Sequence, residues 1–245
     1  MKPHHFIADL FGYKLVKKRK LYQPIEQHLM DLFKRCAINC VIDVGANVGR
    51  YGALLRNGGY RGRIVSFEPA AIPFAKLERV SRDDPSWQVL RLGLGSKAEL
   101  KLLNQMESSA FSSFHQPNDY GSERFKTVIQ VRDTENVSVT TLTRAWPEII
   151  AGIAEPRVFL KLDTQGFDLE VFKGAHDVLD LVYGLQSEIS LKPIYDGVPD
   201  LIETLTEFRD HRFEITGFFP LTRDKESLAI IECDCVLQRP NLASD

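Results

Sequence analysis

The residues CVIDVGANVG, from Cys40 to Gly49, decide the fold of this chain. The apolar residues before the first glycine are typical of a strand covered on both faces, and glycine lets the following backbone turn tightly beside a ligand at a helix start. A strand, a glycine turn and a helix start in this order predict a nucleotide-cofactor loop. The candidate cofactor-binding residues in it are Asp43, Gly45, Asn47 and Gly49.

The spacing of the glycines narrows the choice of cofactor. A dinucleotide fingerprint needs G-x-G-x-x-G, and this loop has Asn47 and Arg50 at the second and third glycine positions, so a pyrophosphate fits poorly. The next expected strand ends at Glu68, 19 positions after Gly49, where such folds place an acid that binds ribose hydroxyls. A ribose without a pyrophosphate indicates S-adenosylmethionine. Asp43 and free amides of the glycine loop are expected to bind the ammonium and carboxylate of its methionine end.

Four motifs of this chain resemble the FkbM-type S-adenosylmethionine-dependent methyltransferases, over most of its length from about Val41 to Arg239. They are VIDVGANVG from Val41, VSFEP from Val65, LKLDTQGFDLEVFKGA from Leu160 and EISLKPIYDG from Glu188. The chain departs from the family pattern at Thr143, Gln165 and Asp168. The resemblance implies a Rossmann-like class I methyltransferase fold, S-adenosylmethionine as cofactor, and O-methylation of a sugar, glycan or secondary metabolite.

Strand and helix patterns alternate along the chain, which is typical of a parallel α/β sheet. A short turn, Thr222 to Glu226, joins the last two expected strands and requires an antiparallel pair. The fold class predicted from this rhythm is α/β, a mostly parallel sheet with an antiparallel strand at the end, and the resemblance implies the same sheet with seven strands and helices on both faces. The expected strands are 41–44, 64–67, 88–92, 100–103, 137–141, 157–162, 182–189, 213–218 and 229–237, and the expected helices are 48–56, 72–81, 144–150, 169–179 and 201–208.

Length and composition indicate one enzyme domain, expected over residues 37–245, because 245 residues that are 44% hydrophobic can bury a sizeable core. A net charge of -2 gives no electrostatic footprint for phosphate backbones, so nucleic acid is not expected as a partner. No Asn/Asp-Pro-Pro-aromatic motif for methylating bases occurs either. With no membrane-length apolar stretch and no signal sequence, we expect a cytoplasmic protein. The four cysteines are expected to be core thiols rather than zinc ligands.

Residues 1–36 form an expected N-terminal basic and helical extension, with the run KKRK at 17–20. Its apolar residues have helical spacing. We favour a solvated arm or a helix packed on the domain. The alternative is membrane contact through this basic segment. We do not favour it, because a single basic cluster of this size binds lipid weakly.

The segment from Asn104 to Lys126 breaks the alternation and is rich in Ser, Asn, Gln, Gly and Pro. Loops of this length are usually functional or disordered, so we expect a mobile lid on the substrate side. His115 lies within it and becomes a candidate base if the lid closes over the site.

Ligands of open α/β sheets bind beyond the carboxyl ends of the strands, which selects Asp163 and Glu188 as catalytic candidates on the acceptor side and Leu94 as a cofactor contact. Partial burial at a strand end raises a carboxyl pKa toward that of a useful base. Lys161 and Asp163 face the same side of their strand, so a structural ion pair is the alternative to catalysis. Nothing in the spacing of the acidic residues requires a metal, and none is expected.

Two other classes of function remain open from the sequence. The first is a nicotinamide-dependent oxidoreductase, which the missing glycines of the loop oppose. The second is a non-enzymatic protein that binds S-adenosylmethionine without turnover. The small-molecule or glycan acceptor and the oligomeric state are not specified by any motif.

Overall fold

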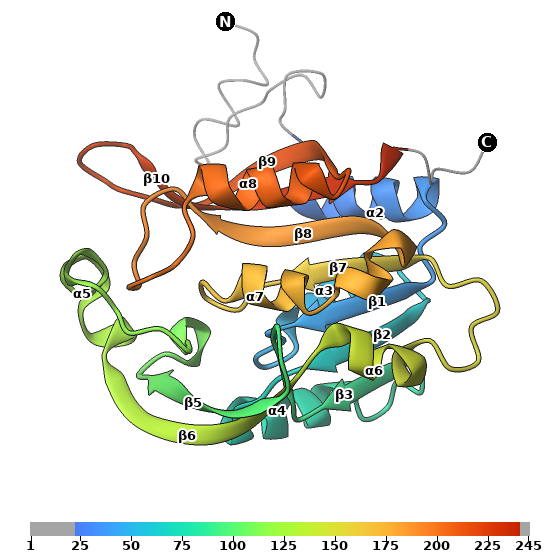
Figure 1. Cartoon of the computed structure of the whole chain (residues 1–245), viewed down its shortest axis with the longest axis horizontal. Coiled ribbons are helices and arrows are strands. Elements are labelled where there is room, and N and C mark those ends of the chain that lie inside the picture. The colour runs from blue at the N-terminus through green and yellow to red at the C-terminus, as the bar shows by residue number, and fades with distance from the viewer. Residues whose placement is uncertain (1–22, 241–245) are drawn as a thin grey trace, which may run out of the picture.

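A computed structural model describes residues 23–240 of the chain, and a seven-stranded sheet runs through its centre (Figure 1). The strands of this sheet are β1 (Cys40–Val44), β2 (Arg63–Phe67), β3 (Trp87–Leu90), β7 (Val158–Leu162), β8 (Val182–Ser190), β9 (Glu214–Arg223) and β10 (Ile230–Gln238). Their order across the sheet is β3-β2-β1-β7-β8-β10-β9. The order reverses at β1, and the crevice beside such a switch point is where α/β sheets bind ligands.

Every pair from β3 to β8 is parallel, and β10 is antiparallel to both of its neighbours. The antiparallel strand is last in the chain but second from the edge of the sheet, because it inserts between β8 and β9. The short turn between β9 and β10 forces this reversal, as the sequence predicts. The predicted fold class, a Rossmann-like and mostly parallel sheet with one antiparallel strand, is confirmed.

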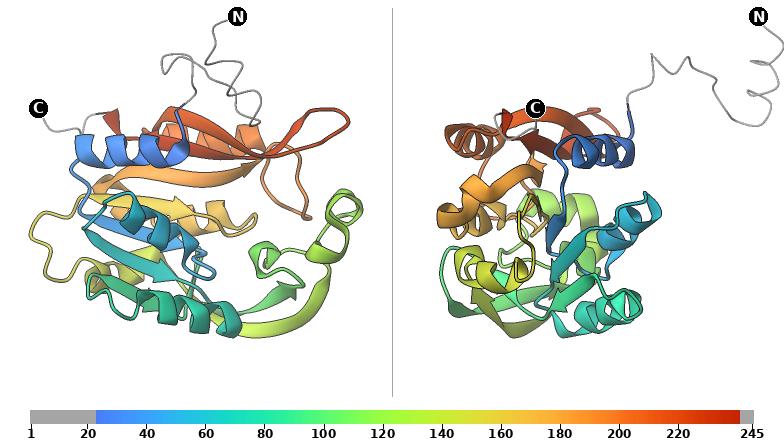
Figure 2. Two further views of the ribbon diagram at one scale, coloured as in Figure 1. Left: turned by 180° about the vertical axis from the view of Figure 1, so that it is seen from behind. Right: turned by 90° about the vertical axis from the view of Figure 1, so that its right-hand side faces the viewer.

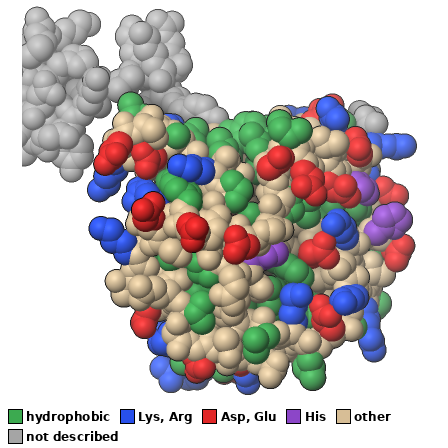
Figure 3. Space-filling view, turned by 60° about the vertical axis from the view of Figure 1, so that its left-hand side comes forward, with side chains coloured by type: hydrophobic (Ala, Val, Ile, Leu, Met, Phe, Trp, Pro, Cys, Tyr) green, Lys and Arg blue, Asp and Glu red, His purple; other side chains and the backbone are tan. Residues whose placement is uncertain are grey.

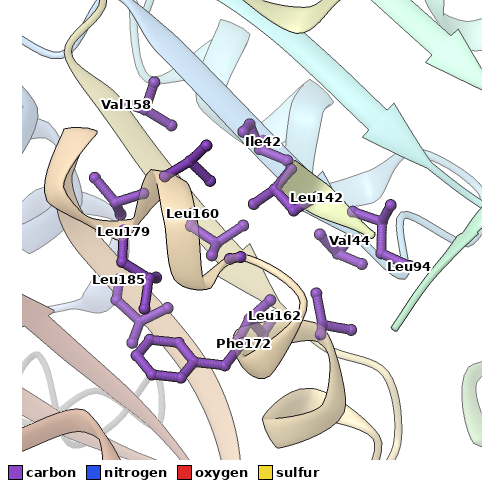
Figure 4. Close-up of a cluster of buried hydrophobic side chains, with 14 of the residues drawn as sticks. Ile42, Val44, Leu94, Leu142, Val158, Leu160, Leu162, Phe172, Leu179 and Leu185 are labelled. Atoms are coloured by element: carbon purple, nitrogen blue, oxygen red, sulfur yellow. The ribbon is translucent and has the colours of Figure 1, made fainter. Parts of the chain in front are cut away.

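Helices cover both faces of the large sheet (Figures 1 and 2). On one side lie α2 (Ile25–Arg35), α3 (Arg50–Asn57) and α4 (Ala71–Ser81), and on the other lie α6 (Leu142–Ile149), α7 (Asp168–Lys173) and α8 (Leu201–Asp210). Alternate strand residues point to the two sides. Val41 and Ile64 pack in the first cluster, whereas Ile42, Leu160 and Leu162 pack in the second, which is drawn in Figure 4. Two hydrophobic clusters, one on each side, therefore support the sheet below its carboxyl edge.

Helix α2 belongs to this body, because Leu29, Leu32 and Phe33 are buried against the sheet. The structure thus places residues 25–35, which we assigned to an N-terminal extension, inside the domain. The basic run at 17–20 and its membrane alternative lie outside the described residues. Between residues 23 and 240, no helix combines the length and the apolar character that crossing a bilayer requires. All four cysteines are buried and free, as expected for core thiols.

A second, three-stranded sheet has the order β4-β6-β5 and contains β4 (Gly93–Leu94), β5 (Glu99–Met106) and β6 (Val131–Thr140). Our expectation that the strand at 137–141 continues the main sheet is wrong. Val137 and Val139 are buried, while their neighbours Asn136 and Ser138 are not. This period of two suits a strand with one exposed face, so β6 pairs with β5 outside the covered sheet.

The expected loop at 104–126 is largely structured. β5 continues to Met106, and η2 (Ser109–Phe111), α5 (Asp119–Phe125) and the adjoining η3 (Lys126–Ile129) follow it. Backbone hydrogen bonds in both directions join Asn104 and Ser113 and close the first part into a hairpin-like turn. Polar and glycine-rich composition misleads here, because asparagine and serine side chains accept hydrogen bonds from the backbone amides of this segment. Asn118, for example, accepts a hydrogen bond from the amide of Gly121.

The helix expected at 169–179 is also interrupted. α7 ends at Lys173, and η4 (His176–Leu181) follows Gly174. A side chain at Gly174 would collide with the backbone of Gly95, so the break in the helix lies directly against the residue that follows β4.

Candidate functional site

A cavity of about 460 Å³ opens at the carboxyl edge of the large sheet, within the size range of small-molecule and cofactor sites. Its wall joins the turn after β1 to the ends of β2, β7, β8 and β10 and to the segment after β5. The polar and charged side chains that line it are Asn47, Arg50, Tyr51, Glu68, Ser109, Ser112, Lys161, Asp163, Thr164, Gln165, Gln186, Glu188, Thr222, Glu232 and Asp234. Among the residues selected from the sequence, the structure brings Gly45, Asn47, Glu68, Leu94, Asp163 and Glu188 to this wall.

The turn after β1 places its backbone against two neighbouring strands. Gly45 has φ +78°, and a side chain there would collide with the carbonyl oxygen of Asp163. Gly49 has φ +84° at the start of α3, and Asn47 also lies in the left-handed region. Glycine is needed at 45 both for its conformation and for the close approach of β1 to β7.

The amides of this turn are less available than we expected from the sequence. Those of Gly45 and Ala46 both donate to the carbonyl of Phe67, and that of Gly49 donates to Ala46. The amide of Asn47 donates to Glu68. The turn therefore packs against β2, and its amides already donate hydrogen bonds within the protein, so they are not free for the carboxylate of a ligand.

Glu68 is anchored by backbone donors at the cavity wall. Its Oε2 accepts from the amide of Asn47 at 2.8 Å, and its Oε1 accepts from the amide of Ala70 at 2.9 Å. Only 7% of the residue is exposed. Burial raises its pKa to about 7 against the opposing effect of these hydrogen bonds. The carboxyl group is thus held rigidly, with lone pairs left to accept from a diol.

Asp43 does not reach the cavity. It is fully buried, accepts from the hydroxyl of Ser66 at 3.1 Å and forms an ion pair with Lys161 at 3.2 Å. The indole of Trp87 donates in turn to Ser66. Direct contact of Asp43 with a bound ammonium is therefore not what this arrangement provides, because its carboxylate is used to neutralise Lys161 behind the wall.

Lys161 lies between two carboxylates. Its Nζ is 3.2 Å from Asp43 and 3.1 Å from Asp163, and it lies 5.0 Å from the centre of the Tyr51 ring. Burial alone lowers the pKa of an ammonium, but the charges of Asp163 and Asp43 outweigh it and raise the pKa of Lys161 above its ordinary value. The ion pair that we considered from the sequence exists, with Asp43 as a second partner.

Asp163 and Glu188 lie together at the cavity wall, at the ends of β7 and β8. Burial pushes the pKa of Asp163 up, yet the Lys161 ammonium and a hydrogen bond from Glu188 hold it below its ordinary value. Burial and the charge of Asp163 raise the pKa of Glu188 well above its ordinary value. Two carboxyl groups pushed apart in this way share one proton, with Glu188 as the protonated member. The pair, called the carboxyl pair below, provides a carboxylate facing the cavity with 38% of its side chain exposed.

Gln165 joins the carboxyl pair to the rest of the wall, and the sequence did not identify it as a site residue. Its Nε2 donates to Glu188 at 2.9 Å and is 3.4 Å from Asp163. Gln165 has φ +53°, and the turn around it is held by Asp168, which accepts from the amide of Thr164. The departures from the family pattern at 165 and 168 therefore lie in the turn after Asp163 and at the start of α7 that follows it.

Two further carboxyl groups were missed. Glu232 and Asp234 on β10 line the cavity, and burial raises the pKa of Glu232 to about 7 and that of Asp234 to about 6. Asp234 lies opposite Glu188 in the sheet and accepts a hydrogen bond from Gln186. A signal for them exists, since acidic residues two apart in an otherwise apolar strand must share one face. Nothing in that pattern says that this face meets the ends of β7 and β8.

The structure does not bring His115 to the cavity. Its ring packs 6.0 Å from that of Phe167, and burial lowers its pKa despite hydrogen bonds to the backbone of Asp196 and Gly166. His115 is not among the residues that line the cavity, so this structure does not place its ring as the base for an acceptor there.

Metal coordination finds no support within residues 23–240, where no three His, Cys, Asp or Glu side chains form a group suited to an ion.

On the face of the molecule shown in Figure 3, acidic and basic side chains are intermixed, and acidic groups run across its upper half.

Comparison with known proteins adds the family. The model of the Methyltransferase FkbM domain matches residues 43–215. Among curated proteins, the comparison finds no match.

Solved structures with related folds are distant in sequence. An rRNA methylase from Streptococcus thermophilus is 14% identical with TM-score 0.46, over 89% of this chain and 98% of that one. The N-terminal domain of human METTL16 in complex with SAH is 10% identical with TM-score 0.47, over 95% and 78%. A precorrin-6y C5,15-methyltransferase from Geobacter metallireducens is 13% identical with TM-score 0.42, over 91% and 93%. These likenesses do not identify an acceptor, and our expectation against nucleic acid stays a prediction.

Proposed function

The chain belongs to the FkbM methyltransferase family, with S-adenosylmethionine as its cofactor, and from this premise we propose that it methylates a hydroxyl group of a neutral, polyhydroxylated small molecule or glycan. The observation that carries the proposal is the carboxyl pair of Asp163 and Glu188, held beside Lys161 at the wall of the cavity. Because the chain belongs to this family, we interpret the glycine loop as part of a methyltransferase site and not as that of a nicotinamide-dependent oxidoreductase.

The cavity residues near the turn after β1 and at Glu68 fit this cofactor. Glu68 presents a rigid carboxyl group for a ribose diol, and the turn from Gly45 to Gly49 brings backbone rather than side chains to the wall. Asn47 and Leu94 lie on the same wall. We call this region, formed by the turn after β1 and Glu68, the cofactor end. The cofactor, when bound, supplies an electrophilic methyl group on a sulfonium.

The acceptor end is formed by Asp163, Glu188, Glu232 and Asp234, and Phe111 and Phe114 line the same cavity. Carboxyl and amide groups beside aromatic rings suit a ligand with many hydroxyl groups, because each hydroxyl donates one hydrogen bond and the carbon skeleton packs on a ring. A phosphate-bearing acceptor would instead meet like charge in a partly desolvated site. This charge pattern supports a neutral acceptor and opposes nucleic acid.

The carboxyl pair then has two tasks. Asp163 accepts a hydrogen bond from the acceptor hydroxyl and fixes the direction of its oxygen, since positioning supplies much of the rate in such a transfer. As that oxygen forms its new bond, the hydroxyl proton becomes strongly acidic, so a carboxylate with a lowered pKa suffices to take it. Lys161 keeps Asp163 ionised, and the one proton that the pair holds before the transfer stays on Glu188.

A mass-spectrometric screen tests the proposal directly. The protein and cofactor are incubated with neutral sugars and polyols, with phosphorylated sugars and with RNA, and each product is searched for an added methyl group. We expect methylation in the neutral set that Asp163→Asn abolishes. Methylation of RNA alone would overturn the acceptor class, and cofactor binding without methylation of any set would favour the non-enzymatic alternative.

A further inference from the structure

A single hydroxyl group connects the carboxyl pair to the segment that closes the cavity. The oxygen of Tyr195 lies 2.7 Å from the carbonyl oxygen of Phe111 and 2.9 Å from Oε1 of Gln165. Residues 109–114, called the cap below, contribute Phe111 and Phe114 to the cavity wall. Both neighbours of the Tyr195 hydroxyl are acceptors, and a tyrosine hydroxyl has one proton to donate.

The choice of acceptor depends on how the Gln165 amide is turned. With its NH₂ toward the carboxyl pair, Gln165 donates to Glu188, and its oxygen accepts the proton of Tyr195. Turned by half a rotation, it would place its oxygen against the oxygens of Glu188 and Asp163. That orientation is unfavourable unless a carboxyl group there has a proton left to donate.

Protonation of the pair creates that donor. While the pair holds one proton, the carboxyl oxygens that face Nε2 of Gln165, at 2.9 Å on Glu188 and 3.4 Å on Asp163, act as acceptors and Gln165 donates. Once Asp163 also takes up the proton of an acceptor hydroxyl, a second carboxyl O–H is available. Gln165 then accepts from the pair and donates to the Tyr195 oxygen, which frees the Tyr195 proton for the carbonyl of Phe111.

We propose that Gln165 and Tyr195 are positioning residues that couple the protonation state of the carboxyl pair to the cap: uptake of a proton by the pair moves the hydrogen bond of Tyr195 from Gln165 to Phe111 and tightens the cap. This inference rests on the proposed role of Asp163. With this coupling, the cap holds the cavity closed until the proton has left the carboxyl pair.

Other charged groups around the pair do not replace this connection. Lys161 reaches Asp163 from β7 with Asp43 behind it, and Glu232 and Asp234 face Glu188 from β10. Among the described residues, the hydrogen bonds that join the pair to the cap pass through Gln165, whose Oε1 meets Tyr195 and whose backbone carbonyl accepts from Ser113. The Ser113 bond is insensitive to the orientation of the side-chain amide, so it anchors the cap without reporting on the pair.

Hydrogen exchange in a double-mutant cycle tests the coupling without any acceptor. Asp163→Asn supplies a permanent neutral donor in place of the carboxylate, and Tyr195→Phe removes only the hydroxyl. The amides of Phe111, Ser112 and Ser113 are read out in the full-length protein, because each donates to a backbone carbonyl when the cap is ordered. We expect Asp163→Asn to slow their exchange by roughly threefold to tenfold in the wild-type background and to leave it unchanged in Tyr195→Phe.

Tyr120→Phe is the matched control, since it removes a buried hydroxyl that has no hydrogen-bond partner among the described residues and packs in the same cluster as Tyr195. In that background the effect of Asp163→Asn should persist. An equal effect of Asp163→Asn with and without the Tyr195 hydroxyl would overturn the coupling, even if Tyr195→Phe loosens the cap. Turnover in the acceptor screen tests the role of Asp163 separately, so either result stands without the other.

Discussion

At the cofactor end of the cavity, Glu68 accepts hydrogen bonds from two backbone amides, whereas at the acceptor end the carboxyl groups of β7, β8 and β10 are bonded mainly to other side chains. A backbone anchor leaves little freedom for the group that it holds. A side-chain anchor can exchange donors and acceptors when a proton arrives. The first end is therefore suited to binding one constant ligand, and the second to chemistry and to a choice of acceptor.

The two ends also differ in charge balance. The negative charge of Asp163 is balanced by Lys161. Within residues 23–240, no salt bridge joins Glu232 or Asp234 to a Lys or Arg side chain. Uncompensated buried carboxyl groups stay partly protonated near neutral pH. The buried carboxyl groups of the acceptor end therefore lower the free energy of unfolding of the protein. The following substitutions test the contrast between the cofactor end and the acceptor end.

The largest effect is expected for Gly45→Ala. The added methyl group would meet the carbonyl of Asp163 at a backbone conformation that alanine rarely adopts, so the turn must move away from β7. We expect cofactor affinity to fall by more than roughly 100-fold by calorimetry, since the clash displaces the wall itself. Gly152→Ala is the control, because Gly152 has the same φ of +78° with open space around it. Unchanged affinity in Gly45→Ala would show that the cofactor end is not the rigid one.

Asp163→Asn should separate turnover from binding. It keeps the shape of the side chain and removes the base, so turnover should fall roughly 100-fold to 10,000-fold while cofactor affinity stays within about twofold. If the ion pair with Lys161 is purely structural, the variant should instead unfold at lower temperature and keep its turnover. Asp84→Asn breaks the ion pair with Arg56 away from the cavity and controls for the loss of a salt bridge.

Glu68→Ala should weaken binding of S-adenosylmethionine and of its demethylated product by about 1.5 to 3 kcal/mol, because charge-assisted hydrogen bonds to the ribose are lost. Isothermal calorimetry measures both ligands. Glu78→Ala, on the exposed side of α4, removes a glutamate without touching the cavity. Equal affinities in Glu68→Ala and Glu78→Ala would remove Glu68 from the cofactor end.

The smallest effect is a change in stability. Burial raises the pKa of Glu232 from 4.5 to about 7, so the folded state binds this proton more tightly than the unfolded chain. The stability that the proton contributes is present at low pH and is lost as the pH rises through about 7. Glu232→Gln should therefore increase the free energy of unfolding above about pH 7, by on the order of 1 to 3 kcal/mol.

Urea unfolding at about pH 5 and about pH 8 measures this difference. The exposed Glu214→Gln controls for the change in net charge. A variant no more stable than wild type at the higher pH would mean that Glu232 is better compensated than its surroundings indicate.

Mobility of the cap is still a prediction. Its amides are hydrogen-bonded in the structure, and the chain from Pro193 to Asp196 holds the segment after it through backbone bonds such as that from Asn118 to Ile194. The lid expected from the sequence spans Asn104 to Lys126, and fast exchange across that segment in the free protein, slowed by cofactor or acceptor, would support it. Slow exchange in the free protein would make it a fixed wall.

Local sequence alone selected Gly45, Asn47 and Glu68, which the structure places on one wall, but it did not show that Asp43 lies behind that wall or that the turn amides are already hydrogen-bonded. The strand, the glycine turn and Glu68 lie within 30 residues, and each acts through backbone conformation or through the end of a neighbouring strand, which a pattern of residue types records. The fold class followed for the same reason, because the alternation of strands and helices and the short β9–β10 turn constrain the topology before any packing is known.

At the acceptor end the sequence selected Asp163 and Glu188, but only the tertiary structure added Glu232 and Asp234. Lys161 and Glu188 lie on β7 and β8, which are paired neighbours in the sheet, whereas Glu232 and Asp234 reach the same wall because β10 inserts between β8 and β9. The sequence also could not show that Asp43 serves Lys161, that His115 faces away, or that Gln165 and Tyr195 meet. Each of these depends on the direction of a side chain across strand or loop contacts, and such directions are set by packing between distant segments rather than by the residues beside them.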